Sequence, residues 1–484
     1  MKTFPIGGVH PSDNKLSRAV AVERFALPDE VRIPLAQHIG APAVAKVAKG
    51  DKVLAGQLIA EAASFMSANI HAPVSGTVTA VDLQPNGQGV RQMMITIKRE
   101  GDEWVPEVDL TPDLVRECTL EPKEILDRIK AAGIVGMGGA TFPTHVKLSV
   151  PPGKKAEFLI INGVECEPYL TSDHRTMLEK GEELMVGTTI LMRALGVKQA
   201  QIGIENNKPD AIAFLRELSK HYEGVRVTPL KVRYPQGGEK QLIAAVTGRQ
   251  VPPPPGLPID VGAVVCNAST TVAVYEAVQK RKPLVERIVT VTGKGMKTPS
   301  NYLVRMGTPI ASLVEAAGDV CYWFFDADYA LRRVDDLRRR MLAEADDPAG
   351  VDRALTSRRQ LLDALAGKRL FAARDTLAER PATVAVEFRT APQPSFNKNF
   401  ELLADDLSAA IQKGYRTYIL SENKAQVERL QNIFHQVGRG GVVFTPVSLT
   451  LHEGFVDHTL RLCCYTDHQL FDRYQRYRIN GEIR

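Results

Sequence analysis

The sequence lacks the features of several protein classes. No run of apolar residues approaches the roughly 18 in succession that a membrane helix needs. The start, Met1–Pro5, lacks the basic stretch and apolar core of a secretory signal, so we expect the chain to stay in the cytoplasm. The net charge of +5, from 61 basic and 56 acidic residues, is too small a bias to indicate direct nucleic-acid binding.

Cysteine patterns and nucleotide fingerprints are also missing. The six cysteines include no C-x-x-C pair, so we predict reduced thiols and no metal centre. Neither G-x-G-x-x-G after a strand nor G-x-x-x-x-G-K-[ST] occurs, which argues against a standard dinucleotide fold and against ATP hydrolysis. If the chain binds a nucleotide, it uses another type of loop.

The 484 residues predict several domains, because single cores rarely grow beyond about 250–300 residues. Residues 34–98 alternate apolar and polar positions around short turns, which indicates a small β-barrel or sandwich. This pattern resembles a lipoyl-type barrel, yet the hairpin "ASFMSANIHAP" has no carrier lysine. We therefore expect a structural or docking module there.

The later segments predict α/β structure. From about Leu120 apolar runs alternate with helical stretches, which is typical of a parallel sheet that binds ligands at the carboxyl ends of its strands. A small β/α unit ends at Gly318, and a charged helix and further α/β texture follow. The predicted class is α/β multidomain: a barrel/sandwich at 1–105, a parallel α/β nucleotide-binding domain at 106–284, a β-grasp-like domain at 285–318 and a C-terminal α/β fragment at 319–484.

The stretch "GIVGMGGATFPTHVKL" is the first candidate site. Its glycines let backbone N–H groups approach a ligand, and a helix starting at about Pro143 would favour a phosphate nearby. Phe142 could stack on a flat ring, and Lys147 could meet a phosphate. On the glycines alone, an ordinary loop is an equal alternative.

Two further turns favour a nucleotide pocket. "LIINGVECEP" places Asn162, Glu165 and Glu167 directly after an apolar strand, although a solvated loop edge would look the same. "YPQGGEKQLI" has paired glycines before Glu239 at a predicted helix start. Three such turns in one α/β unit indicate a nucleotide pocket more strongly than any one of them.

These motifs, with "VTGK…PSNYLVRMGTPI", resemble the C subunit of the Rnf ion-translocating electron transport complex from about Lys2 to Gly318. That family is in turn similar to the flavin-bearing NADH-oxidising subunit of respiratory complex I. The resemblance implies an oxidoreductase subunit that binds FMN and NADH and passes hydride between them. It also implies a peripheral position on the cytoplasmic side of the cell membrane, with an iron–sulfur subunit, membrane subunits and ferredoxin as partners.

The resemblance also implies roles for particular residues. Phe142 would stack on adenine, Lys147 would lie near phosphate, and the remaining residues would line the flavin, the dinucleotide or the nicotinamide. The implied cofactor-binding set is Gly136, Gly138, Gly139, Phe142, Lys147, Asn162, Glu165, Glu167, Glu239 and Asn267.

The sequence departs from that family in three places. "CNASTT" stands where the family usually has a small N-V-G-T stretch, and a run of four prolines replaces a shorter turn. The family continues into a domain whose C-x-x-C-x-x-C-x-x-x-C-P motifs hold iron–sulfur clusters, and no such motif follows Gly318 here. We therefore expect the chain to bind the nucleotides, whereas electrons have no evident route out of the flavin through clusters of its own.

Residues 326–484 resemble another family, through "PQPSFNKNFELLADDL", "KGYRTYILSENKAQVERL" and "TLHEGFVDHTLRLCCYTDHQLFDRYQRYR". These stretches look like a non-motor region of the bacterial transcription-repair coupling factor. Cys463 and Cys464 are adjacent within a predicted strand and point to opposite faces, so we expect buried thiols and not metal ligands.

Two alternatives to the oxidoreductase subunit remain open. In the first, the chain is a transcription-coupled DNA repair fragment that acts as a protein-interaction module through its tail. In the second, the two families meet at 318–326 by a gene-assembly or annotation join, because natural fusions usually keep whole domains and flexible linkers.

Overall fold

The computed structural model describes residues 1–5, 7–86, 91–318, 321–324, 327–344, 357–365, 369–372, 389–421, 423–448, 451 and 453–471. The chain divides into two compact units, Met1–Asp375 and Thr376–Arg484, and each is described by itself. The junction at 318–326 between the two resembled families lies partly outside the described residues.

The first part of unit 1 is a small all-β domain made of two antiparallel sheets, ordered β2-β8-β7-β4 and β3-β5-β6. Along β2 the apolar Val31 and Ile33 are buried and Arg32 between them is exposed, as period-two alternation predicts. Val31 and Ile33 pack against Ile95 and Ile97 of β8. The strands are β2 (Glu30–Pro34), β3 (Val44–Ala45), β4 (Lys52–Val53), β5 (Leu58–Glu61), β6 (Ile70–His71), β7 (Ser75–Pro85) and β8 (Arg91–Gly101).

The central domain is built on a four-stranded parallel sheet, ordered β11-β10-β9-β12, which confirms the parallel sheet expected from the sequence. Its strands are β9 (Phe158–Asn162), β10 (Ala200–Glu205), β11 (Val225–Leu230) and β12 (Ala263–Asn267). Its helices are α1 (Pro122–Ala131), α2 (Thr144–Leu148), α3 (Ser172–Glu179), α4 (Gly181–Leu195), α5 (Pro209–Ser219), α6 (Glu239–Thr247), the 3-10 turn η1 (Pro258–Val261) and α7 (Ala268–Gln279).

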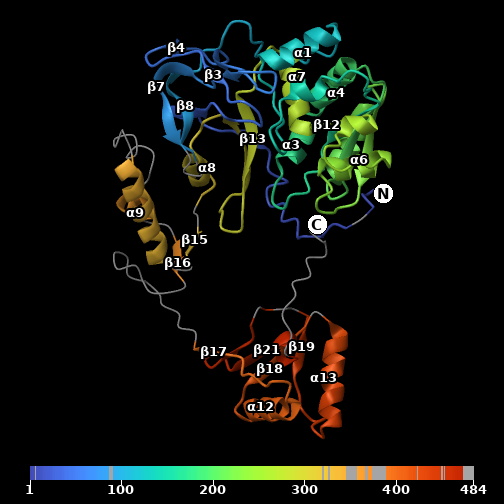
Figure 1. Cartoon of the computed structure of the whole chain (residues 1–484), viewed down its shortest axis with the longest axis vertical. Helices are drawn as coiled ribbons and strands as arrows, with labels where there is room; N and C mark the ends of the chain where they lie inside the picture. Colours follow the sequence, from blue (N-terminus) through green and yellow to red (C-terminus); the bar gives the residue numbers. More distant parts are fainter. Residues whose placement is uncertain are drawn as a thin grey trace. The chain divides into compact units, whose positions relative to one another are not determined.

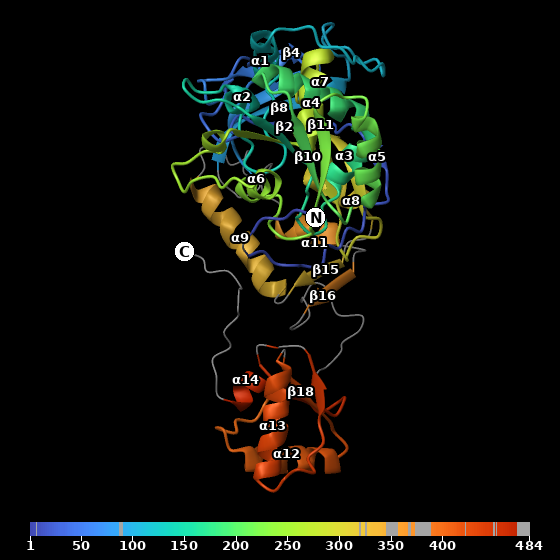
Figure 2. The same ribbon diagram turned by 90° about the vertical axis from the view of Figure 1, so that its right-hand side faces the viewer.

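Both faces of this sheet are covered. Leu159 and Ile161 of β9 point into a core shared with α4, α5 and α7. Ile160, between them, points into a second core shared with α6. β10 and β11 run between α6 on one side and α5 on the other (Figure 2), and Figure 1 shows β12 with α6 and α7 beside it. Burial on both faces explains why the strands are continuous apolar runs. A ligand can therefore reach the sheet at the ends of its strands.

A third, smaller sheet has the order β1-β14-β13 and packs against α8. β13 and β14 are antiparallel, whereas β1 comes from the start of the chain and joins β14 in parallel. No local sequence pattern indicates this long-range pairing. The elements are β1 (Val22–Arg24), β13 (Glu286–Val291), β14 (Ser300–Arg305) and α8 (Ile310–Ala316).

After Gly318 the described residues of unit 1 form a parallel strand pair and two helices. The charged helix expected near Arg332–Arg340 is present as α9, and Arg332, Arg333, Arg339 and Arg340 on it are exposed. The elements are β15 (Cys321–Phe324), α9 (Ala327–Glu344), α11 (Arg358–Leu365) and β16 (Arg369–Ala372).

Unit 2 is a five-stranded mixed sheet ordered β17-β20-β21-β18-β19, with α12 and α13 packed on it. Cys463 is buried and Cys464 is half-buried on the neighbouring position of β21, and both thiols are free. The elements are β17 (Thr390–Pro392), α12 (Phe400–Gln412), β18 (Arg416–Leu420), α13 (Lys424–Gln436), β19 (Thr445–Val447), β20 (Phe455–Asp457), β21 (Leu462–Thr466) and α14 (Asp467–Leu470).

A buried arginine connects the small sheet to the barrel domain. Arg305 Nε lies 3.1 Å from Glu286 Oε2, and its Nη2 lies 3.0 Å from Asp102 Oδ2. Its Nη1 donates to the Pro73 carbonyl, and the guanidinium lies 4.7 Å from the centre of the Trp104 ring. Three of these four partners flank the β7–β8 hairpin, so Arg305 fixes the small sheet against it.

We expect Arg305→Met to lower the free energy of unfolding by about 3–5 kcal/mol, because removal of one partner leaves the Glu286 carboxylate buried with less compensation. Arg32→Met is the matched control: its ion pair with Glu30 is exposed, and such pairs contribute about 0–1 kcal/mol. Urea denaturation of both variants measures the difference. Equal losses in the two variants would contradict a stabilising role for the buried network.

Candidate functional site

The site lies at the carboxyl ends of the central strands. Asn162 ends β9 and Asn267 ends β12, and the two residues are direct partners in the parallel register. Asn267 Oδ1 accepts a hydrogen bond from the Thr270 N–H at 3.1 Å and so caps α7. Asn162 Nδ2 donates to the Gly237 carbonyl at 2.8 Å, which connects the β9 end to the loop before α6.

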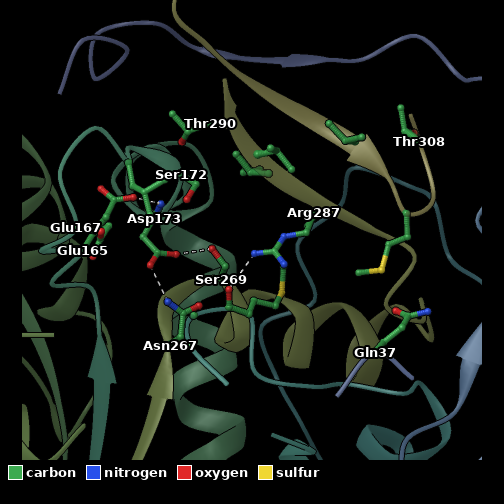
Figure 3. A pocket seen from close by; sticks show the side chains of 18 of the residues that line it. Gln37, Glu165, Glu167, Ser172, Asp173, Asn267, Ser269, Arg287, Thr290 and Thr308 are labelled. Atoms are coloured by element: carbon green, nitrogen blue, oxygen red, sulfur yellow. Dashed lines mark hydrogen bonds between the residues drawn. The ribbon is translucent and has the colours of Figure 1, made fainter. Parts of the chain in front are cut away.

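A cavity of about 850 Å³ opens beside these strand ends. Its lining comes from all three domains of the first 318 residues: the barrel strand β2, the central domain and the small sheet (Figure 3). A volume of this size falls in the range of about 300–1,000 Å³ that is usual for ligand pockets. Its polar lining residues are Gln37, Asn162, Glu165, Glu167, Ser172, Asp173, Asn267, Ser269, Arg287, Thr290, Arg305 and Thr308.

Glu165 is a buried carboxylate with an unsatisfied oxygen at this cavity. Its Oε1 accepts a 2.7 Å hydrogen bond from the Asp173 N–H in the first turn of α3, whereas its Oε2 is buried without a hydrogen-bond partner. Lys15 Nζ lies 3.8 Å from Oε2, too far for a hydrogen bond. Burial, reinforced by the Asp173 carboxylate and opposed by Lys15 and Lys208, raises the pKa of Glu165 to about 7. The side chain can therefore hold or release a proton near neutral pH.

Two buried lysines hold the loop that carries Glu165. Lys15 Nζ donates to the Glu165, Glu167 and Leu170 carbonyls at 2.9, 2.9 and 2.6 Å. Lys208 Nζ donates to the Val164 carbonyl at 2.7 Å. This support is needed because Glu165 has a φ of 46°, in the left-handed region that costs a non-glycine residue energy.

Asp173 binds two polar side chains at the carboxyl end of β12. Its Oδ2 accepts from Asn267 Nδ2 and its Oδ1 accepts from Ser269 Oγ, both at 2.6 Å (Figure 3). A Cβ added at Gly138 would lie 2.6 Å from Asn267 Nδ2, so the backbone of the glycine loop approaches this side chain closely. Gly139, with a φ of 116°, takes a backbone conformation that side-chain-bearing residues rarely adopt.

Six of the ten predicted site residues line the cavity together. They are Gly138, Gly139, Asn162, Glu165, Glu167 and Asn267. Gly136, Phe142, Lys147 and Glu239 lie outside this lining. Lys147 Nζ instead pairs with Glu239 Oε1 at 2.8 Å and donates to the Val265 carbonyl at 3.0 Å. The expected helix starts are present, at Thr144 for α2 and at Glu239 for α6.

Sequence reasoning missed five polar residues of this region. Ser269 stands within "CNASTT". Asp173 lies shortly after "LIINGVECEP", and its sequence signal is a carboxylate that follows "TS" at the start of a helix. Lys15, Lys208 and Arg287 reach the site from distant segments, and no local pattern marks them.

Neither a metal centre nor a membrane helix is found in the described residues. Within the described ranges no group of three or more His, Cys, Asp or Glu side chains is placed to hold a metal ion. Across the same part of the chain, no helix is long and apolar enough to cross a membrane.

Three family models match the first 318 residues. They are the RnfC barrel sandwich hybrid domain at residues 2–102, the Nuo51 FMN-binding domain at 129–276 and the SLBB domain at 288–318. None of these matches extends into the tail. The resemblance of residues 326–484 to the coupling factor thus gains no support and stays a prediction.

Curated relatives cover the same portion. The C subunit of the proton-translocating ferredoxin:NAD⁺ oxidoreductase complex of Clostridium ljungdahlii is 47% identical over 322 residues, 66% of this chain and 69% of that protein. The C subunit of the Na⁺-translocating ferredoxin:NAD⁺ oxidoreductase complex of Acetobacterium woodii is 42% identical over 317 residues, 64% of this chain and 70% of that protein. A crystal structure of an NAD⁺-reducing [NiFe]-hydrogenase aligns at 26% identity with a TM-score of 0.36, covering 41% of this chain and 39% of that one. The resemblance seen in the sequence motifs is thereby confirmed, and the chain belongs to the Rnf-type C subunits of ion-translocating ferredoxin:NAD⁺ oxidoreductase complexes.

Proposed function

We propose that this chain binds FMN and NADH in the cavity at the strand ends and acts as the nucleotide-binding subunit of a membrane-bound ferredoxin:NAD⁺ oxidoreductase. The observation that carries the proposal is the cavity of about 850 Å³ at the ends of β9 and β12, which Gly138, Gly139 and the buried Glu165 line together.

The residues present fit a flavin nucleotide in three respects. Gly138 and Gly139 expose backbone to the cavity where a side chain would collide or be strained. Glu165, Glu167 and Asp173 supply acceptors for the N–H and hydroxyl groups of a flavin and its ribityl chain. The matched model for residues 129–276 describes an FMN-binding domain.

When bound, FMN would supply the hydride and electron chemistry, while the chain binds, orients and excludes water. Asn267 and Ser269, held by Asp173, would fix the orientation of the ligand at the β12 end. Glu165 would carry a proton on its buried carboxyl group at or below neutral pH, because its pKa lies near 7. The other predicted residues would support the site from outside the cavity lining. Gly136 and Phe142 belong to the glycine loop, and Lys147 pairs with Glu239.

We further propose the domain limits 1–105, 106–284, 285–318 and 319–484. The matched ranges 2–102, 129–276 and 288–318 support the first three. The relatives' names support membership in a multi-subunit complex, with an iron–sulfur subunit, membrane subunits and ferredoxin as the proposed partners and the cytoplasmic side of the membrane as the proposed location.

Titration of the purified chain with FMN and, separately, with NADH tests this function. We expect saturable quenching of flavin fluorescence and a one-to-one stoichiometry by calorimetry for each ligand. The absence of binding at millimolar FMN would refute the proposal.

A further inference from the structure

Among the described residues Arg287 makes no ion pair, unlike Arg305, the other arginine at the cavity, although the Asp173 carboxylate acts on it electrostatically. Arg305 is paired with Glu286 and Asp102. In the part of the chain that the structure describes, Arg287 makes one hydrogen bond, from Nη2 to the Met137 carbonyl at 2.9 Å, and no ion pair. A partly buried guanidinium with five N–H donors and one neutral acceptor has unused binding capacity.

Arg287 is itself part of the cavity wall. Arg287 lies on β13, the edge strand of the small sheet, and lines the cavity. Figure 3 shows its side chain extending from that strand toward Ser269 at the start of α7. A helix N-terminus carries a partial positive charge, so Arg287 and α7 together make this part of the cavity favourable for an anion.

The cavity also has an uneven charge distribution. Its lining carboxylates, Glu165, Glu167 and Asp173, all belong to the central domain, whereas Arg287 comes from the small sheet. Both oxygens of Asp173 already accept hydrogen bonds from Asn267 and Ser269. The Asp173 carboxylate acts electrostatically on Arg287 without a direct ion pair, so the guanidinium keeps donors for an anionic group of a ligand.

We propose that Arg287 binds a phosphate oxygen of the nucleotide, so that the small sheet supplies a specificity-determining residue to the cavity. This inference rests on the proposed function, because it assumes that a phosphorylated ligand occupies the cavity. The phosphate belongs either to the monoester of FMN or to the diphosphate of NADH. A guanidinium suits both, since its planar fork can donate two parallel hydrogen bonds to phosphate oxygens.

Arg287 also positions the glycine loop. Thr270 Oγ1 accepts from the Met137 N–H at 2.8 Å, while Arg287 donates to the Met137 carbonyl. The test must therefore separate phosphate binding from loop positioning, and ligands with and without phosphate make that separation.

The experiment compares Arg287→Met, Arg287→Lys and Lys294→Met with the unmodified full chain. Lys294 is an exposed residue of the β13–β14 connection, so its variant removes one positive charge from the same sheet without touching the cavity. Dissociation constants are measured for FMN and riboflavin, and then for NADH and ADP-ribose. Thermal denaturation verifies that each variant is folded.

If Arg287 binds the flavin phosphate, Arg287→Met weakens FMN by about 10- to 100-fold more than it weakens riboflavin. If it binds the dinucleotide, NADH and ADP-ribose weaken by that factor and FMN does not. Arg287→Lys recovers part of the loss in either case, and Lys294→Met changes neither ligand.

Equal weakening of FMN and riboflavin would overturn the proposal in favour of loop positioning alone. Changes below about 2-fold for all four ligands would overturn it as well, since a phosphate contact is worth more than that. Failure of the unmodified chain to bind either FMN or NADH would instead refute the proposed function, and this inference with it.

Discussion

Gly138→Val is expected to weaken FMN binding by about 10- to 100-fold, which corresponds to about 1–3 kcal/mol of overpacking. The added Cβ would lie 2.6 Å from Nδ2 and 2.9 Å from Cγ of Asn267. Asn267 has little freedom to move away, because Nδ2 donates to Asp173 and Oδ1 caps α7. A shift of the Asn267 side chain would therefore disturb both its hydrogen bond to Asp173 and its cap on α7.

Gly136→Ala is the matched control for this variant. A Cβ at Gly136 meets its nearest neighbour, the Phe142 nitrogen, at an ordinary 3.5 Å, and Gly136 does not line the cavity. Flavin fluorescence titration measures both variants. An FMN affinity unchanged in Gly138→Val would contradict the placement of the flavin against this loop.

Glu165→Gln is expected to remove a pH dependence of stability. The pKa of this carboxyl rises from 4.5 to about 7 on folding, mainly through burial. Between these two values the folded state binds the proton and the unfolded state does not, so stability falls as pH rises. The stabilisation is fully present below pH 4.5 and is lost through pH 7, a total of about 3 kcal/mol.

The Gln variant keeps the shape of the neutral acid and cannot ionise, so its unfolding free energy should lack this decline. Chemical denaturation at intervals from about pH 5 to 8 measures the slope. Glu167→Gln, on the same loop but exposed, should keep the decline seen in the unmodified chain. Parallel pH profiles for Glu165→Gln and the unmodified chain would show that the buried carboxyl does not titrate in this range.

Local patterns are enough to predict the parts of the site that lie in one segment. The apolar run before Asn162 predicts a strand with a ligand at its end, and β9 ends at that residue. The paired glycines before Glu239 predict a helix start, and α6 begins there. These features depend on hydrophobic periodicity and turn chemistry, which a single segment carries by itself.

The remaining features depend on contacts between distant segments. Lys15 reaches the Glu165 loop across 150 positions, and β1 pairs with a strand that follows it by more than 270 residues. The place of Lys147 after the glycine loop predicts a phosphate near it, and it gives no sign of the ion pair that its ammonium group makes with Glu239. Only the packing of the central domain on α2 determines that contact, and no spacing in the sequence encodes it.

The most direct test of the central claim is anaerobic addition of one equivalent of NADH to the chain loaded with FMN. We expect loss of the visible flavin absorbance, because both nucleotides would share one cavity at the ends of β9 and β12. Gly138→Val at the same total FMN concentration should lose far less absorbance. If the oxidised flavin spectrum persists in the unmodified chain while FMN is demonstrably bound, FMN and NADH do not react in a shared cavity.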